Sequence, residues 1–364
     1  MLYAAEYVLP GHPDKLCDAI ADSLVEAAAR LEKRALCGIE VAVHRASVFI
    51  TGRIACSGAK KIPVAESARE CYRTAGYGPE WQPRPEELEV QTNLCLGPLL
   101  PGEPGFREVS DDQSIITGYA VDSPGTNWLP PEHWLASRLA RRLEALREEC
   151  PELRLGPDGK LAILFDDEVK TISCFTASLQ QSIGADEIDL NRAVRRCVTA
   201  ELQAQAQAIP GLRQELPASF HVNGAGNFEV GGPEGDNGLS GKKLVVDAYG
   251  PRVPIGGGAL SGKDFFKADR AGAVLARRLA KAVVMSGAAT ECTATLAIAP
   301  GDREFRVVSL AGGQAILDTL RWTRLIDLSM ASSGESFAQM PGLAGLARYG
   351  HFTSPDHPWE RIAF

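Results

Sequence analysis

The sequence predicts an α/β fold, of the α+β type, built from three related units. Three passes along the chain alternate strand-like segments rich in Val and Ile with helix-like segments of 3.6-residue apolar spacing. The chain has 364 residues, of which 45% are hydrophobic, enough for two or three cores. No low-complexity linker separates the passes, so we expect the three units to pack against one another.

The first unit opens with a helix that begins near Pro13. Apolar residues recur at helical spacing as far as Leu31, and proline is tolerated in a first turn because its missing N–H would be unpaired there. The Val- and Ile-rich stretch 39–54 predicts strands, and 64–76 predicts a helix. The segment LGPLLPGEPGF, 96–106, contains too many Pro and Gly residues for a regular helix or a central strand, and is expected to be a loop.

The second and third units repeat this order. The second predicts strands at 114–121, 161–166 and 171–179, and helices at 131–149 and 190–208. The third predicts strands near 220–230, 243–247, 292–298 and 306–310, and a helix at about 267–286. We place approximate domain boundaries at 1–108, 109–222 and 223–364, and expect the chain to be interleaved between the domains.

The charge balance argues against a nonspecific nucleic-acid surface. The formal net charge is −8, whereas such a surface needs clustered excess Lys and Arg. The sequence contains no run of about 18 uncharged apolar residues, so it predicts no membrane-spanning helix. The N-terminus also lacks the basic and apolar regions of a secretory signal. We therefore expect a cytoplasmic protein that binds neither nucleic acid nor membrane.

The segment GHPDK, 11–15, is the first candidate for chemistry. It opens the first helix, where unpaired N–H groups and a partial positive charge suit an anion, and His12 and Lys15 would add donors. An acid at position 14 also stabilises a first turn without any catalytic role. The same helix carries one acidic stripe, a pattern that is more often a solvated face than a metal site: Asp14, Asp18, Asp22 and Glu26.

A glycine-rich segment, GGPEGDNGLSGKK at 231–243, is the second candidate. Its glycines free the backbone to approach a ligand closely. Asp236, Lys242 and Lys243 add one acid and two bases to the same loop. The alternative is an ordinary turn that leads into a strand.

The third candidate, PIGGGALSGKD at 254–264, has the glycine and Gly-Lys spacing of a phosphate-binding P-loop. Asp264, however, stands where that loop needs a Ser or Thr hydroxyl for Mg²⁺. We therefore expect a nest of backbone N–H groups around phosphate oxygens, with Lys263 as a point charge, in place of a true P-loop. A carboxylate near the next helix start, Asp269, would then hold the metal ion.

These segments, in this order and followed by the C-terminal YGHFTSPDHPWE, closely resemble the methionine adenosyltransferases, also called S-adenosylmethionine synthetases. The resemblance runs nearly from end to end. It implies three mixed-sheet-plus-helix domains about a pseudo-threefold axis, and active sites between the subunits of a homodimer or homotetramer. It also implies the reaction, in which the sulfur of methionine attacks the ribose 5′ carbon of ATP. The whole triphosphate then leaves and is cleaved to pyrophosphate and phosphate.

This reaction accounts for the residue types in the motifs. A neutral sulfur has no proton to lose, so catalysis consists of alignment and of stabilising a highly charged leaving group. The resemblance assigns the catalytic contacts with the triphosphate to His12, Lys242, Lys243 and Lys263. It assigns contacts with ATP or the amino acid to Asp112, Asp167, Lys170 and Asp236, and the expected nest adds Gly257 and Gly258 as ATP-binding positions.

The resemblance also implies two Mg²⁺ ions per site and a K⁺ ion, with ATP as a substrate. Asp14 and Asp269 match the carboxylates that hold Mg²⁺. Glu6 and Glu40 match acids near the cations, and Glu40 matches the acid linked to K⁺.

Two departures from the family pattern stand out. Arg53 replaces a usual Glu that receives the ammonium group of methionine, and two facing cations repel. The substitution Arg53→Glu is therefore expected to improve the use of methionine. The segment 96–106 replaces the usual gating loop, which alters lid closure. Two alternatives stay open: an adenosyltransferase for another sulfur compound or a triphosphatase, and a non-catalytic subunit homologue.

Overall fold

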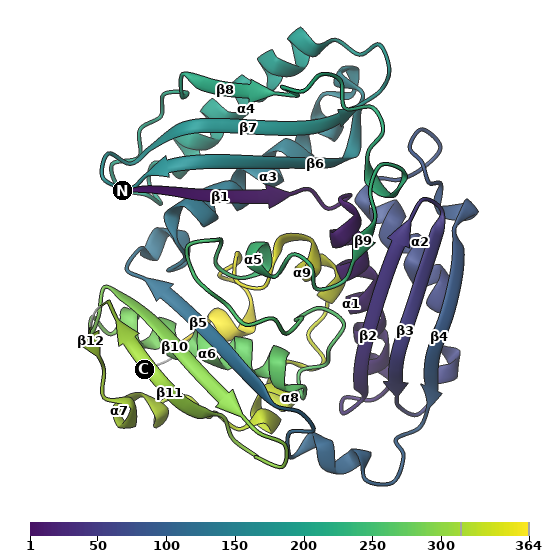
Figure 1. Ribbon diagram of the computed structural model, residues 1–364, viewed down its shortest axis with the longest axis vertical. Helices are drawn as coiled ribbons and strands as arrows, with labels where there is room; N and C mark the ends of the chain where they lie inside the picture. Colours follow the sequence, from purple (N-terminus) through teal and green to yellow (C-terminus); the bar gives the residue numbers. More distant parts are fainter. Residues whose placement is uncertain (314, 363–364) are drawn as a thin grey trace.

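A computed structural model of the protein describes residues 1–313 and 315–362. Within them, three four-stranded sheets surround a central region that holds α5 (Leu244–Asp247) and α9 (Leu343–Tyr349) (Figure 1). The α/β class and the three-unit architecture expected from the sequence are confirmed. No helix in the described residues is long and apolar enough to span a membrane.

Two of the sheets are mixed and one is antiparallel. The first has the order β1 (Leu2–Val8), β6 (Leu155–Asp166), β7 (Thr171–Gln181) and β8 (Ser219–Val222), with only β7 and β8 parallel. The second has the order β4 (Glu89–Gly97), β3 (Ser47–Ala55), β2 (Leu36–His44) and β9 (Gly238–Leu239), with only β3 and β4 parallel. The antiparallel third sheet has the order β12 (Ala315–Ile316), β11 (Arg306–Gly312), β10 (Glu291–Ile298) and β5 (Ser114–Val121).

Each sheet is covered by a long helix. Helix α1 (Pro13–Leu31) packs on β2, α3 (Pro131–Glu149) on β1 and β6, and α6 (Ala268–Met285) on β5 and β10. The remaining helices are α2 (Val64–Ala75), α4 (Glu187–Gln205), α7 (Thr319–Thr323) and α8 (Met330–Phe337). Short 3-10 helices occupy Ala59–Lys61, Pro85–Glu87, Glu103–Arg107, Pro124–Thr126, Pro151–Leu153, Gly232–Glu234 and Pro358–Glu360.

The sheets take strands from distant parts of the chain. Strand β1 pairs with β6, β5 pairs with β10, and β9 pairs with β2. Segments 1–108, 109–222 and 223–364 therefore each contribute a strand to a sheet built mainly from another segment. As a result, residues far apart in sequence meet at the ends of the sheets.

Local sequence patterns gave correct element types for most of the chain, with one reversal. The predicted strand at 243–247 is wrong, because Leu244–Asp247 forms α5. Its apolar run is short and lies between glycine-containing turns, and the buried Asp247 forms an ion pair with Lys15 of α1. The predicted strand at 220–230 is reduced to β8 by the glycines that follow it.

Candidate active site

His12 caps the N-terminus of α1 with its own side chain. Its Nδ1 accepts a hydrogen bond from the backbone N–H of Asp14 at 3.2 Å, and Pro13 occupies the first helical position. Burial, and after it the ammonium group of Lys243, lowers the pKa of His12 to about 4. The ring is therefore neutral near pH 7. Because Nδ1 accepts, we assign the proton to Nε2, which is left as a donor for an anion.

Asp14 joins the first helix to the loop around Lys243. One carboxylate oxygen accepts the backbone N–H of Leu239 at 3.0 Å, and the other accepts Lys243 Nζ at 2.8 Å. Lys242 Nζ lies 3.7 Å from the same carboxylate. Burial acts to raise the pKa of Asp14, but these hydrogen bonds outweigh it and the pKa is lowered. The structure thus brings His12, Asp14, Lys242 and Lys243 together as one cluster, called here the Asp14 cluster.

The acidic stripe of α1 is buried, so the expectation of a solvated face is wrong. Asp18 accepts the backbone N–H of Gly241 at 2.8 Å, and Asp22 accepts that of Gly262 at 2.9 Å. Glu26 accepts the N–H groups of residues 342 and 343. Asp22 is also paired through both oxygens with the buried Arg270, at 2.7 and 2.8 Å. The stripe therefore fixes both glycine-rich loops to one helix by their backbones.

A second cluster, the Asp269 cluster, lies at the first turn of α6. Lys263 forms an ion pair with Asp269, and the Ser114 hydroxyl donates to the same carboxylate. A Cβ on Gly258 would collide with this carboxylate, so the glycine lets the loop lie against it. Asp112 lies two residues before Ser114, at the start of β5. Gly257 has open space around its Cα, because a Cβ there would meet no atom within 4 Å.

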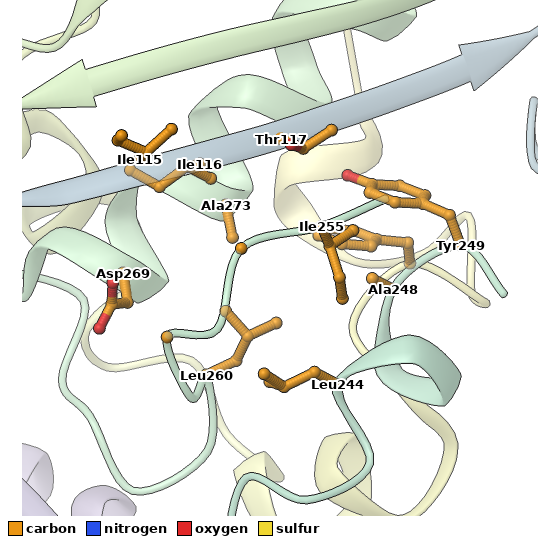
Figure 2. Close-up of a pocket in the computed structure, with 13 residues that line it drawn as sticks. Ile115, Ile116, Thr117, Leu244, Ala248, Tyr249, Ile255, Leu260, Asp269 and Ala273 are labelled. Carbon is orange, nitrogen blue, oxygen red and sulfur yellow. The ribbon is translucent and has the colours of Figure 1, made fainter. Parts of the chain in front are cut away.

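A small, mostly apolar cavity of about 40 Å³ adjoins the Asp269 cluster. Figure 2 shows Asp269 at one side of it and Leu244 and Tyr249 at the other. The cavity thus has a charged edge at Asp269 and mostly apolar walls elsewhere.

Asp264, the residue that breaks the P-loop pattern, has a structural role. Its carboxylate accepts the backbone N–H groups of Cys37 at 2.7 Å and Phe266 at 2.8 Å, and the guanidinium of buried Arg107 at 2.7 Å. The helix that a P-loop would open directly begins only at Ala268. The loop at 256–263 is therefore a glycine turn pinned to β2 and α1, and its lysine points to Asp269.

The remaining predicted acids lie near the Asp14 cluster with other partners. Glu6 pairs with Lys160 at 2.8 Å, and Glu40 accepts the Ser240 hydroxyl at 2.6 Å. Asp236 lies close enough to His12 to raise its pKa, against the larger lowering effects. These three acids come from β1, β2 and the 231–243 loop.

Asp167 and Lys170 are not brought to either cluster. They form an ion pair at 2.7 Å with each other, at the end of β6 that pairs with Leu2. The opposite end of β6, paired with Val8 next to His12, carries a different acid and lysine that sequence reasoning missed, Asp158 and Lys160. Their signal was available: PDGK at 157–160 echoes the PDK of the first motif.

Asp158 and Lys160 both act on the Asp14 cluster. Lys160 contributes to the lowered pKa of His12. Burial raises the pKa of Asp158 to about 6, although its carboxylate accepts the N–H of Gly232 at 2.7 Å. The cluster therefore contains one more cation than the sequence predicted.

Arg53 does not present a free cation. It forms two parallel hydrogen bonds with Glu103, at 2.6 and 2.7 Å, and a third with the carbonyl of Pro98 at 3.0 Å. Glu103 lies in the segment that replaces the usual gating loop, and its carboxylate also accepts the N–H of Leu100 at 2.6 Å. The reversed charge at position 53 is thus matched by an acid from the altered loop.

The neutral state of His12 is testable. In the folded protein we expect His12 to remain neutral from pH 8 to 5.5 as the Nε2–H tautomer, because its pKa is about 4. Nitrogen-15 NMR of the six histidines, with His12→Asn to assign the signal, measures both properties. The unfolded residue titrates near pH 6.5, so between pH 6.5 and 4 the unfolded state binds a proton that the folded state does not. The contribution of neutral His12 to folding stability is therefore complete above pH 6.5 and is lost as the pH falls toward 4. A titration midpoint near 6.5 in the folded protein would contradict this assignment.

Comparison with known proteins identifies the family of this chain. Models of the S-adenosylmethionine synthetase N-terminal, central and C-terminal domains match residues 1–95, 107–228 and 230–361. The S-adenosylmethionine synthase of Corynebacterium kroppenstedtii is 33% identical over 391 residues, covering 99% of this chain and 96% of the relative. That of Ruegeria pomeroyi is 31% identical over 393 residues, covering 99% and 96%. The solved structure of an unusual S-adenosylmethionine synthetase from Campylobacter jejuni has a TM-score of 0.86 at 25% identity, covering 99% of this chain and 97% of that one. The chain belongs to the S-adenosylmethionine synthetase family.

Proposed function

We propose that the protein transfers the adenosyl group of ATP to the sulfur of methionine, and that it cleaves the released triphosphate to pyrophosphate and phosphate. We further propose that it does so in the cytoplasm. The observation that carries this proposal is the Asp14 cluster, where a neutral imidazole donor and two lysines converge at a helix N-terminus. Such an array suits a polyphosphate and contains no activated nucleophile of its own.

The protein's own residues would act on the leaving group. The Nε2–H of His12 and the ammonium groups of Lys243 and Lys263 would donate to phosphate oxygens as negative charge gathers on them. The ammonium of Lys160, held by Glu6, would add a further charge at the same cluster. Since the attacking sulfur is neutral, none of these groups needs to remove a proton from it.

The donor sets fit Mg²⁺ shared with ATP. Among the described residues, no group of three or more His, Cys, Asp or Glu side chains could hold a metal ion. Mg²⁺ commonly binds through one or two carboxylates together with substrate phosphates, and Asp14 and Asp269 each supply one carboxylate beside lysines. Two Mg²⁺ ions there would neutralise the departing triphosphate. For K⁺, the candidate ligand is Glu40.

We also propose that the Asp14 and Asp269 clusters complete one site across a homodimer, alone or within a homotetramer. Within one chain they stand on the first turns of two different helices, α1 and α6. Exposed apolar side chains on β3, β5 and β11 favour a subunit contact through the sheets: Phe49, Ile115 and Val308 are 45%, 70% and 62% exposed.

The reaction is tested by incubating the purified protein with ATP, Mg²⁺ and K⁺, with and without methionine. We expect equimolar S-adenosylmethionine and pyrophosphate that depend on methionine. Phosphate release without a sulfonium product would overturn the proposal in favour of a triphosphatase or another acceptor. Absence of any turnover would favour the non-catalytic homologue.

The Arg53–Glu103 pair reverses the expectation drawn from the sequence for position 53. In Arg53→Glu, the new carboxylate would repel that of Glu103, and the segment 98–103 would lose its hydrogen bonds to position 53. We therefore expect the KM for methionine to rise about tenfold. The charge swap Arg53→Glu with Glu103→Arg should recover most of the loss. Steady-state kinetics of the single and double variants measure this coupling.

The matched control is Arg73→Glu, which breaks exposed ion pairs of α2 with Glu66, Glu70 and Glu86. It should leave the KM unchanged, because exposed pairs contribute little. A methionine KM that improves in Arg53→Glu would show that the pair does not hold the loop for amino-acid binding.

A further inference from the structure

We propose that the protein has a second anion-binding pocket, between α3, α4 and the segment 353–356, that takes a small molecule bearing a phosphate or carboxylate group. The pocket is open to solvent and has a volume of about 470 Å³, and Arg138 and Arg141 of α3 line it. It shares no residue with the Asp14 or Asp269 cluster. The inference therefore stands independently of the proposed reaction.

Arg141 is the central observation. Its guanidinium stacks on the Tyr349 ring at 3.8 Å and donates to the Thr353 hydroxyl at 3.1 Å. Its Nε is buried and makes no hydrogen bond. In the part of the chain that the structure describes, no acidic side chain forms an ion pair with it. A guanidinium cannot lose its proton at physiological pH, so this partly buried charge has no directly paired acid in the free protein.

The neighbouring acids lie next to other arginines. Glu201 lies 3.5 Å from Arg138, and Glu144 pairs with Arg348. Burial is the main cause of the lowered pKa of Arg141; Tyr7 and Glu144 act to raise this pKa, and Arg138 and Arg348 act to lower it. Leaving a buried charge unpaired is costly, whereas an oxyanion from solution would supply the missing partner.

The pocket walls favour a small ligand with an uncharged body. Arg138 lies over the Trp134 ring at 5.8 Å, and that ring forms part of the wall. The Trp134 N–H is already used by Gln205 at 2.8 Å, so Gln207 and Ser354 are the side chains left to bond polar atoms of a ligand. Asp356, the acid in the lining, is exposed at the rim, where solvent weakens its repulsion.

The test is isothermal titration with inorganic phosphate and, separately, with succinate, against sodium chloride of equal ionic strength. The two ligands distinguish a phosphate from a carboxylate source. We expect one of them to bind the wild-type protein, and Arg141→Gln to weaken that binding at least tenfold. Arg142→Gln is the matched control, because the next residue of α3 pairs with Glu149 outside the pocket. It should bind like the wild type.

A further variant separates this pocket from the phosphate groups of the candidate active site. Lys243→Ala should leave the Arg141-dependent binding intact, since Lys243 belongs to the Asp14 cluster. Should Arg141→Gln fail to fold, Arg138→Gln replaces it with the same expected loss. Binding that is equal in wild type and Arg141→Gln, or no binding of either anion, would overturn the proposal.

Discussion

Replacement of Lys263 by alanine is expected to lower kcat by roughly 10²- to 10³-fold, the range typical for loss of one charged group that stabilises a transition state. Lys263 pairs with Asp269 beside the glycine turn, and its side chain is 25% exposed. The fold should survive, because a partly exposed ion pair contributes about 1 kcal/mol or less. Rates of S-adenosylmethionine formation, with thermal unfolding in parallel, measure both effects.

The control for this substitution is Lys33→Ala. Lys33 forms an exposed ion pair with Glu335 at 2.9 Å, far in sequence from both glycine loops. Its loss should change neither kcat nor the unfolding temperature appreciably. A Lys263→Ala enzyme with a wild-type rate would remove Lys263 from the phosphate site.

The second large effect is expected on stability, from Asp22→Ala. Removal of one partner from a buried ion pair typically costs about 3–5 kcal/mol, because the other charge stays buried without compensation. Asp22 and Arg270 are both fully buried, and Asp22 also accepts the N–H of Gly262. We expect urea unfolding to show a loss of that size, with Arg270→Met giving a similar value.

Asp189→Ala is the control variant for the loss of an exposed ion pair. Asp189 of α4 pairs with Arg192 at 2.6 Å. Its expected cost is below about 1 kcal/mol. The double variant Asp22→Leu with Arg270→Met should be less destabilised than either single variant, because no unpaired charge remains. Equal and small losses in all of these variants would mean that the buried pair does not anchor the loop.

The sequence predicted those features that local pattern controls. Strand β5 and helix α3 have the bounds expected from alternation and from 3.6-residue spacing, Ser114–Val121 and Pro131–Glu149. The short apolar run at 243–247 was assigned to the wrong type, since four or five residues cannot distinguish a strand from a helical turn. Strand β1 was not predicted, and its pairing with β6 depends on residues more than 150 positions away.

In the candidate site, too, local sequence patterns predicted some features, whereas contacts between distant residues determined the others. Motif spacing found His12, Asp14, Lys243 and Lys263, but no local pattern shows whether a carboxylate faces solvent or a backbone N–H from another domain. For this reason the sequence pattern predicted a solvated face for the acidic stripe, which is in fact buried. For Lys160, the PDGK motif at 157–160 is a sequence signal, but the register of β1 against β6 is what brings this lysine near His12.

The tethering of loops to α1 has a consequence for how the protein is made. The helix leaves the ribosome before the residues whose N–H groups satisfy its four acids, which are 239–262 and 342–343. Burial of a carboxylate without a hydrogen-bond partner costs free energy. We therefore expect the acids of α1 to stay hydrated until residues 342–343 have emerged. Nascent chains stopped before residue 340 should therefore expose this helix to proteases and chaperones, whereas complete chains should not.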